Sequence, residues 1–385
     1  MLDSTFFRAC EAAAERWNVP ALAVGVLLPG TSYEQLAVGC TPDTRFRVAS
    51  ITKPLTATLA LQLLDLEAST GIWPEDVKVR HLLSHTSGYD CELGDLADFG
   101  DGDDALDAAV AELGSVRRFL PVEQAWSYAN TGYWLAGALA AAAAGSTYEE
   151  ALEARVLTPA HMDASDFGEP DLAGTGPGAQ GGYPRGRRPS GGLVSTVRDL
   201  LCFADWQLGL GWTRALRVPH GKPVGGVYGL GFAGERVGGV DVWGHNGSYG
   251  GFQSSLLLVP DRRAAFVGLT NSGQGKQALR ELEDLWFELL LGARRRVAPT
   301  IGLAPEVLGE FCGVYANRDE RATVSAGGDG LVVQFLEGNE SAEVSARPIG
   351  PSTFEIVGGP YARDRFDFPL PGFARFGSTL TPRGV

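Results

Sequence analysis

A serine and a lysine three residues apart, Ser50 and Lys53, form the pair best suited to nucleophilic chemistry in this sequence. Pro54 follows them, and because proline is tolerated in a helix only within its first turn, a helix must begin close to Ser50. Backbone N–H groups at a helix N-terminus have no intrahelical partner and lie at the positive end of the helix dipole, which favours a developing oxyanion. Side chains three apart share a helical face, so the Lys53 amine reaches the Ser50 hydroxyl.

The same S-x-x-K pattern has a plainer interpretation, a capping serine followed by a solvated lysine, and by chance it recurs about once in a few hundred residues. The stretch from Leu55 onward, however, is apolar enough to be a core helix. A lysine in the first turn of such a helix has buried neighbours, which favour its neutral form and lower its pKa. The sequence therefore predicts that Lys53 acts as a base toward Ser50.

Two further segments carry polar groups that could serve the same site. Residues 126–130 read Trp-Ser-Tyr-Ala-Asn before a predicted helix. There the Tyr128 phenol can shuttle the serine proton and the Asn130 amide can bridge a lysine and a substrate carbonyl. Residues 243–250 are glycine-rich at a predicted strand, which is typical of a backbone that approaches a ligand. The alternatives are an ordinary helix start with a packed tyrosine, and a hairpin turn.

These motifs, in this order, resemble those of the serine β-lactamase and penicillin-recognising family, particularly its class C β-lactamase, esterase and D-aminopeptidase branch. Residues 50–53 resemble the S-x-x-K nucleophile motif, 128–130 the Y-x-N motif and 245–247 the K/H-x-G strand motif. Residues 82–88 (Leu-Leu-Ser-His-Thr-Ser-Gly) and 191–196 (Gly-Gly-Leu-Val-Ser-Thr) match two further motifs of the family. Five ordered matches make coincidence implausible.

The resemblance implies a role for each matched residue. The catalytic residues would be Ser50, Lys53, Tyr128, Asn130 and His245, with His245 on the opposite wall of the cleft assisting the leaving group. The oxyanion hole would be the backbone N–H groups of Ser50 and Ser248. The substrate-binding residues would be Tyr89, Asn246, Gly247 and Tyr249. No metal and no cofactor are implied.

The implied fold is α+β, β-lactamase/transpeptidase-like. It has an antiparallel sheet flanked by terminal helices, an inserted all-helical lobe and a small C-terminal all-β module. Apolar patterns agree, with helical periodicity before about residue 144 and strand signals over 240–269. We expect a catalytic domain over residues 1–296, with its helical lobe over about 61–210, and the β module over 303–385.

Two connecting regions carry expectations of their own. Residues 168–192 are rich in glycine and proline, so they predict an irregular surface loop that borders the site. Residues 308–315 weakly resemble the opening of the lipocalin-like or half-barrel domain appended to several esterases and D-aminopeptidases of the family. The β module is therefore expected to shape the cleft or to form a dimer contact.

One departure from the family pattern bears on the substrate. Where β-lactamases of this branch usually carry Lys-Thr-Gly, this chain has His-Asn-Gly over 245–247, as is more typical of esterases, D-amino-acid amidases and transacylases. A mostly neutral imidazole replaces the cation that helps hold a β-lactam carboxylate. With an ordinary pKa of about 6.5, His245 would regain charge as the pH falls toward about 5.5, and the preference for carboxylate substrates would rise.

The main interpretation is a serine hydrolase that cleaves an ester or amide bond through an acyl-serine intermediate and is not an efficient β-lactamase. Three alternatives stay open. The first is a transacylase that passes the acyl group to an amine or alcohol in biosynthesis. The second is a β-lactamase or D-peptidase. The third is a catalytically silent penicillin-binding-like protein.

Composition limits the partners. The chain has 385 residues, 44% hydrophobic, and a net charge of −14, which repels nucleic acid and anionic membranes. Its longest apolar run falls short of the roughly 20 residues that span a bilayer, and its first residues lack the pattern of a secretory signal. We expect a cytoplasmic protein with a small-molecule ester or amide substrate and no nucleic-acid or membrane partner. Assembly into a homo-oligomer stays open.

Overall fold

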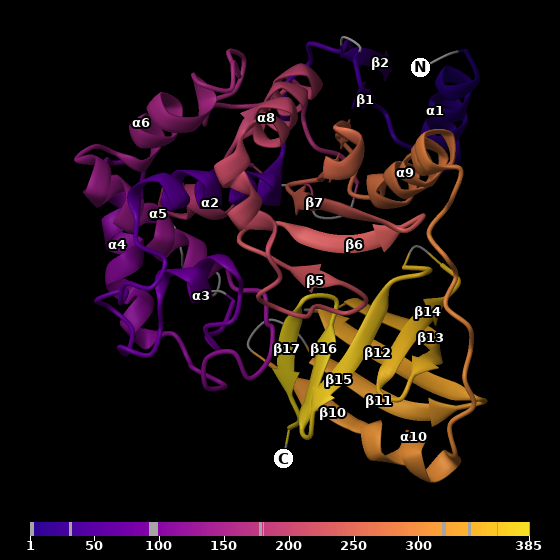
Figure 1. Cartoon of the computed structure of the whole chain (residues 1–385). Helices are drawn as coiled ribbons and strands as arrows, with labels where there is room; N and C mark the ends of the chain where they lie inside the picture. Colours follow the sequence, from indigo (N-terminus) through magenta and orange to yellow (C-terminus); the bar gives the residue numbers. More distant parts are fainter. Residues whose placement is uncertain are drawn as a thin grey trace.

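The computed structural model describes residues 4–30, 33–91, 99–176, 179, 181–317, 321–337, 340–359 and 361–384. Within these ranges the chain forms a seven-stranded antiparallel sheet surrounded by helices and, from its C-terminal residues, an eight-stranded antiparallel sheet (Figure 1). A short two-stranded pair completes the sheets. The predicted α+β class, with an antiparallel sheet and a C-terminal β module, is confirmed.

The seven-stranded sheet combines strands from both ends of the first three-quarters of the chain. Its order is β2-β1-β9-β8-β7-β6-β5. The bounds are β1 Leu22–Leu27, β2 Glu34–Val38, β5 Val227–Tyr228, β6 Ala233–Val237, β7 Val240–Tyr249, β8 Phe252–Val259 and β9 Ala264–Thr270. Strand β1 is buried along its whole length because alternate side chains enter the hydrophobic clusters on opposite faces of the sheet. That burial explains its unbroken apolar sequence.

Helices cover both faces of this sheet. On one face α1 (Ser4–Arg16) packs against α9 (Gly275–Leu291), which Figure 1 shows side by side at the edge near the N-terminus. On the other face α8 (Val197–Gly209) packs against β1 and β9. Helix α2 (Thr52–Leu63) contacts β7 and lies against α5 (Asn130–Ala144) in the main hydrophobic core.

The remaining helices of the first part are short. They are α3 Val79–Leu83, α4 Ala105–Ala111, α6 Tyr148–Leu152 and α7 Arg188–Gly191. Helix α6 begins at a capping box in which the Thr147 side chain accepts from the Glu150 N–H and the Glu150 side chain accepts from the Thr147 N–H.

The prediction that residues 168–192 lack regular structure is wrong at their C-terminal end. There a 3₁₀ turn (Arg185–Arg187) leads into α7, and Ser190 is buried. Pro189 occupies the first turn of α7, where proline is tolerated, and its ring packs at Gly137 of α5. Tertiary packing therefore orders a segment whose composition favours an irregular loop.

The C-terminal sheet joins consecutive strands in order, β10 to β17. The bounds are β10 Gly313–Ala316, β11 Arg321–Gly327, β12 Gly330–Glu337, β13 Glu340–Gly350, β14 Thr353–Val357, β15 Arg365–Leu370, β16 Phe373–Phe376 and β17 Thr379–Pro382. A bridge between Tyr315 and Arg383 brings the two edges together into a near-barrel. The sequence analysis did not predict one short helix, α10 (Pro305–Phe311). Its Phe311 ring stacks on that of Phe368, with the ring centroids 4.5 Å apart.

No helix among the described residues is both long and apolar enough to cross a bilayer.

Candidate active site

Ser50 lies at the start of α2, in the 3₁₀ turn Ala49–Ile51 that follows the short strand β3 (Phe46–Arg47). The turn is tight, since Ala49 has a left-handed φ of 47°, a conformation that an alanine rarely adopts. Neighbouring segments hold it in place. The Val48 N–H donates to the Leu193 carbonyl at 3.0 Å, and the Ser254 hydroxyl donates to the Val48 carbonyl at 2.8 Å. The nucleophile motif is thus supported by the Gly-Gly-Leu motif and by β8.

Lys53 is fully buried one turn along from Ser50. Its Nζ lies 3.2 Å from Ser50 Oγ and donates to the Ser190 carbonyl at 2.6 Å. It also lies over two tyrosine rings, 4.6 Å from the centroid of Tyr128 and 5.4 Å from that of Tyr133. The expectation that the S-x-x-K spacing brings amine and hydroxyl together agrees with this geometry.

The Tyr128 phenol donates to Ser50 Oγ at 2.9 Å, so the serine oxygen is flanked by a lysine and a tyrosine. Tyr128 ends the extended segment before α5. Desolvation, and after it the nearby Tyr228, raises the pKa of Tyr128 well above its ordinary value. The hydrogen bond with Ser50 offsets only part of this rise in the pKa. Tyr128 is therefore a neutral phenol in the resting site and is better suited to donate a proton than to remove one.

His245 is buried in β7 and both ring nitrogens have protein partners. Nδ1 lies 2.6 Å from the Asn246 carbonyl and Nε2 lies 3.0 Å from the Tyr228 hydroxyl. Because a carbonyl only accepts, Nδ1 carries the hydrogen and Nε2 accepts from Tyr228. Burial, with the Lys53 charge nearby, lowers the pKa of His245 to about 3. The expectation that His245 regains charge near pH 6 is therefore wrong, because a buried imidazole beside a lysine resists protonation.

The backbone of β7 runs directly past the turn that holds Ser50. Strand β6 pairs with β7 only as far as Gly244, so residues 245–249 form an edge that faces the 3₁₀ turn. A Cβ at Gly247 would lie 3.1 Å from the Ser50 nitrogen and 2.2 Å from the Val48 carbonyl oxygen. Only glycine permits this approach, which the expected pair of oxyanion donors from Ser50 and Ser248 requires.

Three other residues expected in the site, Asn130, Tyr249 and Asn246, have different surroundings. Asn130 is the first residue of α5 and its Nδ2 contacts Cys91 Sγ at 3.7 Å. Tyr249 contacts the segment before α7, since its hydroxyl donates to the Gly182 carbonyl at 3.2 Å and its ring centroid lies 4.7 Å from that of Tyr183. Asn246 is exposed, because alternation along β7 turns its side chain away from the face of His245.

Tyr89 does not join the site. It stacks on Trp73 with ring centroids 4.0 Å apart and is only 7% exposed. Tyr89 is expected from the resemblance to bind substrate, but its side chain belongs to the main hydrophobic core.

Three residues that the sequence analysis did not assign complete the surroundings. Ser190 supplies the carbonyl to Lys53, and Tyr228 supplies the hydroxyl to His245. His85 is buried, and its Nδ1 accepts the Ala129 N–H at 3.0 Å, which helps to fix the Tyr-Ala-Asn segment. His85 was within reach of sequence reasoning, because it belongs to the matched Leu-Leu-Ser-His-Thr-Ser-Gly motif. Nothing in the sequence pointed to Tyr228.

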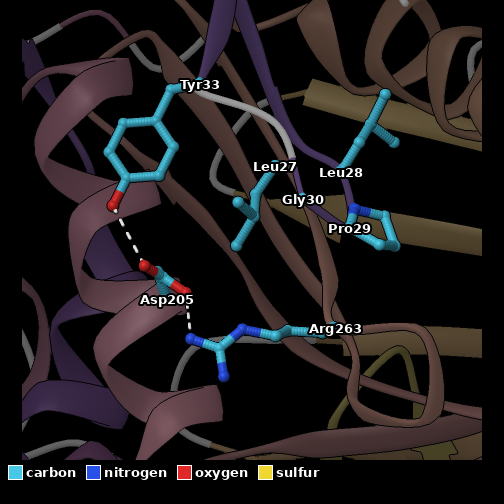
Figure 2. Close-up of a pocket in the computed structure, with 7 residues that line it drawn as sticks. All are labelled: Leu27, Leu28, Pro29, Gly30, Tyr33, Asp205 and Arg263. Carbon is cyan, nitrogen blue, oxygen red and sulfur yellow. Dashed lines mark hydrogen bonds and ion pairs between the residues drawn. The ribbon is translucent and has the colours of Figure 1, made fainter.

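A separate cavity of about 420 Å³ lies where β1 ends and β9 begins, at the end of these strands away from Ser50. Figure 2 shows the Tyr33 hydroxyl and the Arg263 guanidinium turned toward the same Asp205 carboxylate, with Leu27, Leu28 and Pro29 as its apolar wall. The Tyr33 hydroxyl donates to Asp205 Oδ2 at 3.5 Å, and Arg263 donates to Asp205 Oδ1 at 2.9 Å. Among the described residues, none of the candidate catalytic side chains lines this cavity.

The fold and the matched motifs define a class, the proteins with a β-lactamase-like fold. The model of the Beta-lactamase family matches residues 7–291, and the chain belongs to this family. The resemblance that the motifs suggested is thereby confirmed.

Individual relatives agree with this assignment. The chain is 31% identical to penicillin-binding protein 4 of Amycolatopsis lactamdurans over 320 residues, which cover 70% of this chain and 81% of that protein. A crystal structure of SurE with D-Leu superposes with a TM-score of 0.76 at 25% identity and covers 99% of both chains. A D-amino acid amidase from Ochrobactrum anthropi, complexed with L-phenylalanine amide, has a TM-score of 0.64 at 21% identity and covers 74% of this chain and 99% of its own.

Proposed function

We propose that this protein is a serine hydrolase that cleaves an ester or amide lacking a carboxylate through an acyl intermediate on Ser50. The observation that carries the proposal is the Ser50 hydroxyl oxygen held between Lys53 Nζ at 3.2 Å and the Tyr128 hydroxyl at 2.9 Å. An activated serine needs a base and a proton donor within such distances. The proposal takes residues 1–296 as the catalytic domain and 303–385 as the β module.

In the proposed acylation step, Ser50 Oγ attacks the substrate carbonyl while its proton passes to Lys53, which is the neutral amine in the reactive form. The neutral Tyr128 phenol donates a proton to the leaving oxygen or nitrogen, and the ammonium of Lys53 then restores the phenol. Water repeats the attack to release the acid. Every proton has a donor and an acceptor among these side chains, so the mechanism requires no metal or cofactor.

The remaining residues would bind and polarise the substrate. The backbone N–H groups of Ser50 and Ser248 would hold the oxyanion, which Gly247 permits by its lack of a Cβ. Asn130 would orient the acyl group. His245, neutral with both nitrogens engaged, would act as an uncharged wall and not as an acid for the leaving group.

The uncharged wall supports a choice of substrate. A cation at this strand position would favour a substrate carboxylate, whereas a neutral imidazole does not. SurE is known with D-Leu bound and another relative acts as a D-amino acid amidase, so esters and amides of D-amino acids are the first substrates to test. We expect them to be cleaved faster than nitrocefin.

The decisive experiment is labelling with a fluorophosphonate followed by peptide mass spectrometry. We expect a single adduct on Ser50 that is absent in Ser50→Ala. Labelling that persists undiminished in Ser50→Ala would overturn the assignment of the nucleophile. A stable adduct with no turnover on any short-chain ester or D-aminoacyl amide would instead indicate a catalytically silent penicillin-binding-like protein.

Acyl transfer to an amine is a second candidate. It is supported by the contact of Tyr249 with Gly182 and Tyr183, through which the 181–192 segment closes over the β7 edge and would limit water. Product analysis with added amines separates the two reactions, since a transferase gives the aminolysis product in excess over the acid.

A further inference from the structure

The extended segment that carries Tyr128 is held on two sides. On one side His85 accepts two backbone N–H groups, that of Ser127 at its carbonyl oxygen (3.0 Å) and that of Ala129 at its Nδ1 (3.0 Å). On the other side lies the hairpin of β16 and β17 from the C-terminal β module, residues 373–382. Figure 1 shows this hairpin on the side of the module nearest the helical part of the molecule.

The hairpin makes one hydrogen bond to each of three consecutive residues of the segment. Arg375 donates to the Trp126 carbonyl at 2.8 Å. The Leu380 N–H donates to the Ser127 hydroxyl at 3.1 Å, and the Tyr128 N–H donates to the Ser378 carbonyl at 3.0 Å. The backbone of the tyrosine motif is therefore completed by a part of the chain about 250 residues away in sequence.

Arg375 is the side chain through which this contact is fixed. It is 3% exposed, and Asp367 of β15 binds its guanidinium through both carboxylate oxygens, at 2.9 Å and 2.5 Å. The guanidinium carbon lies 5.6 Å from the centre of the Trp126 ring. A bidentate pair leaves the planar guanidinium little freedom, so its Nη1 is aimed at the Trp126 carbonyl.

We propose that Arg375 is a positioning residue, which holds the Trp126–Tyr128 backbone so that the Tyr128 phenol stays within hydrogen-bond distance of Ser50. The inference rests on the proposed function, in which Tyr128 donates the proton to the leaving group. Among the described residues, the contacts of the Arg375 guanidinium are with Asp367 and Trp126 and not with the side chains of Ser50 or Tyr128, so its effect passes through the backbone. The C-terminal β module is thereby part of the catalytic apparatus.

A small displacement of Tyr128 is enough to matter. Misplacing a catalytic group by about 1 Å costs on the order of 100-fold in rate. The test is the rate at which a short-chain alkyl ester labels Ser50 as the acyl-enzyme, followed by mass spectrometry in the full-length protein, because an alcohol leaving group needs the proton that fluoride would not. We expect Arg375→Met, which keeps the length but not the hydrogen bonds, to slow labelling by about 10- to 100-fold. Arg375→Lys, which retains one donor, should recover part of that loss.

Arg347→Met is the control. Arg347 pairs with Glu355 in the same module, and it also donates to Thr300 in the connecting chain. Because Glu355 keeps Arg365 as a partner at 3.1 Å, we expect Arg347→Met to lower the melting temperature less than Arg375→Met does and to leave the labelling rate unchanged. Equal slowing by the two variants would show that only the stability of the module matters and would overturn the proposal.

A double-mutant cycle with Tyr128→Phe separates positioning from a general structural effect. If Arg375 acts through the Tyr128 phenol, Arg375→Met produces no further slowing in the Tyr128→Phe protein. The same factor in both backgrounds, or wild-type labelling in Arg375→Met, overturns the inference and leaves the proposed function intact. Absence of Ser50 labelling in the unmodified protein would instead overturn the proposed function and, with it, this inference.

Discussion

At the scale of single residues, the proposed chemistry depends on which groups near Ser50 carry charge. Lys53 is the basic side chain at hydrogen-bond distance from the serine, whereas Tyr128 and His245 are held neutral by burial. Neither Tyr128 nor His245 therefore supplies a charge that would hold a substrate carboxylate. Two predictions follow from this distribution.

Tyr128→Phe removes the proton donor while keeping the ring that packs near Lys53. We expect the rate of Ser50 acylation by a short-chain ester to fall by about 100- to 10,000-fold, which is the usual contribution of general acid–base catalysis. Tyr148→Phe is the control, because Tyr148 is a buried tyrosine whose hydroxyl forms its hydrogen bond with Thr56 at 2.7 Å and not with Ser50. Stopped-flow acylation rates for both proteins check this, and comparable rates for the two variants would contradict the role of Tyr128.

The low pKa of His245 predicts a flat pH dependence of substrate preference. An imidazole with a pKa of about 3 stays neutral at every pH above about 4, so its charge does not change between pH 8 and 5.5. The ratio of kcat/KM for nitrocefin to that for an uncharged ester should therefore be constant over this range. His245→Lys should raise the ratio by about one to two decades, since it adds a cation. A ratio that rises in the unmodified protein as pH falls would show that His245 protonates.

At the scale of elements, the site depends on close approach between β7 and the turn that carries Ser50. A Cβ at Gly247 would lie 2.2 Å from the Val48 carbonyl oxygen and 2.3 Å from Ser254 Oγ. We expect Gly247→Ala to push β7 away, to destabilise the protein by about 1–3 kcal/mol and to slow acylation by more than about 100-fold. Thermal unfolding and labelling rates measure the two effects.

Gly114→Ala is the control for that prediction. Gly114 lies in a 3₁₀ turn with nothing within 4 Å of an added Cβ. Both measurements should stay at the wild-type level in this variant. If Gly247→Ala also labels at the wild-type rate, the β7 edge does not form the oxyanion hole.

At the scale of the whole molecule, a second contact joins the C-terminal β module to the catalytic part. Asp364 accepts from Lys276 at 2.6 Å and from Arg280 at 2.9 Å on α9, and Arg363 pairs with Asp284 at 3.0 Å. Several charges form one partly buried network here, which contributes more than isolated surface pairs do. We expect Asp364→Asn to lower the melting temperature by a few degrees, corresponding to about 1 kcal/mol.

The salt dependence distinguishes an electrostatic contact from packing. In 1 M salt, where the Debye length is about 3 Å, the difference between wild type and Asp364→Asn should shrink. Asp241→Asn is the comparison, because its pair with Arg236 is exposed on both sides and 3.4 Å long. It should change the melting temperature little at any salt concentration. A difference for Asp364→Asn that is independent of salt would contradict the electrostatic origin.

The sequence by itself determined the chemistry that depends on short spacing. Ser50 and Lys53 are three residues apart beside a proline, so local helix geometry brings them together before any tertiary contact forms. The apolar runs of β1, β8 and β9 likewise predict buried strands, because burial on both faces leaves no alternation. The family and the α+β class followed from such local signals taken in order.

Tertiary structure alone decided the properties that depend on distant neighbours. The pKa of His245 fell to about 3 because its burial and the nearby Lys53 come from packing between separate elements. Tyr89 joined the core because Trp73 stacks on it, and Ser190 became ordered because α7 packs on α5. The contact of Arg375 with the Trp126 carbonyl links segments about 250 residues apart in sequence. No local sequence pattern encodes where two such distant segments meet.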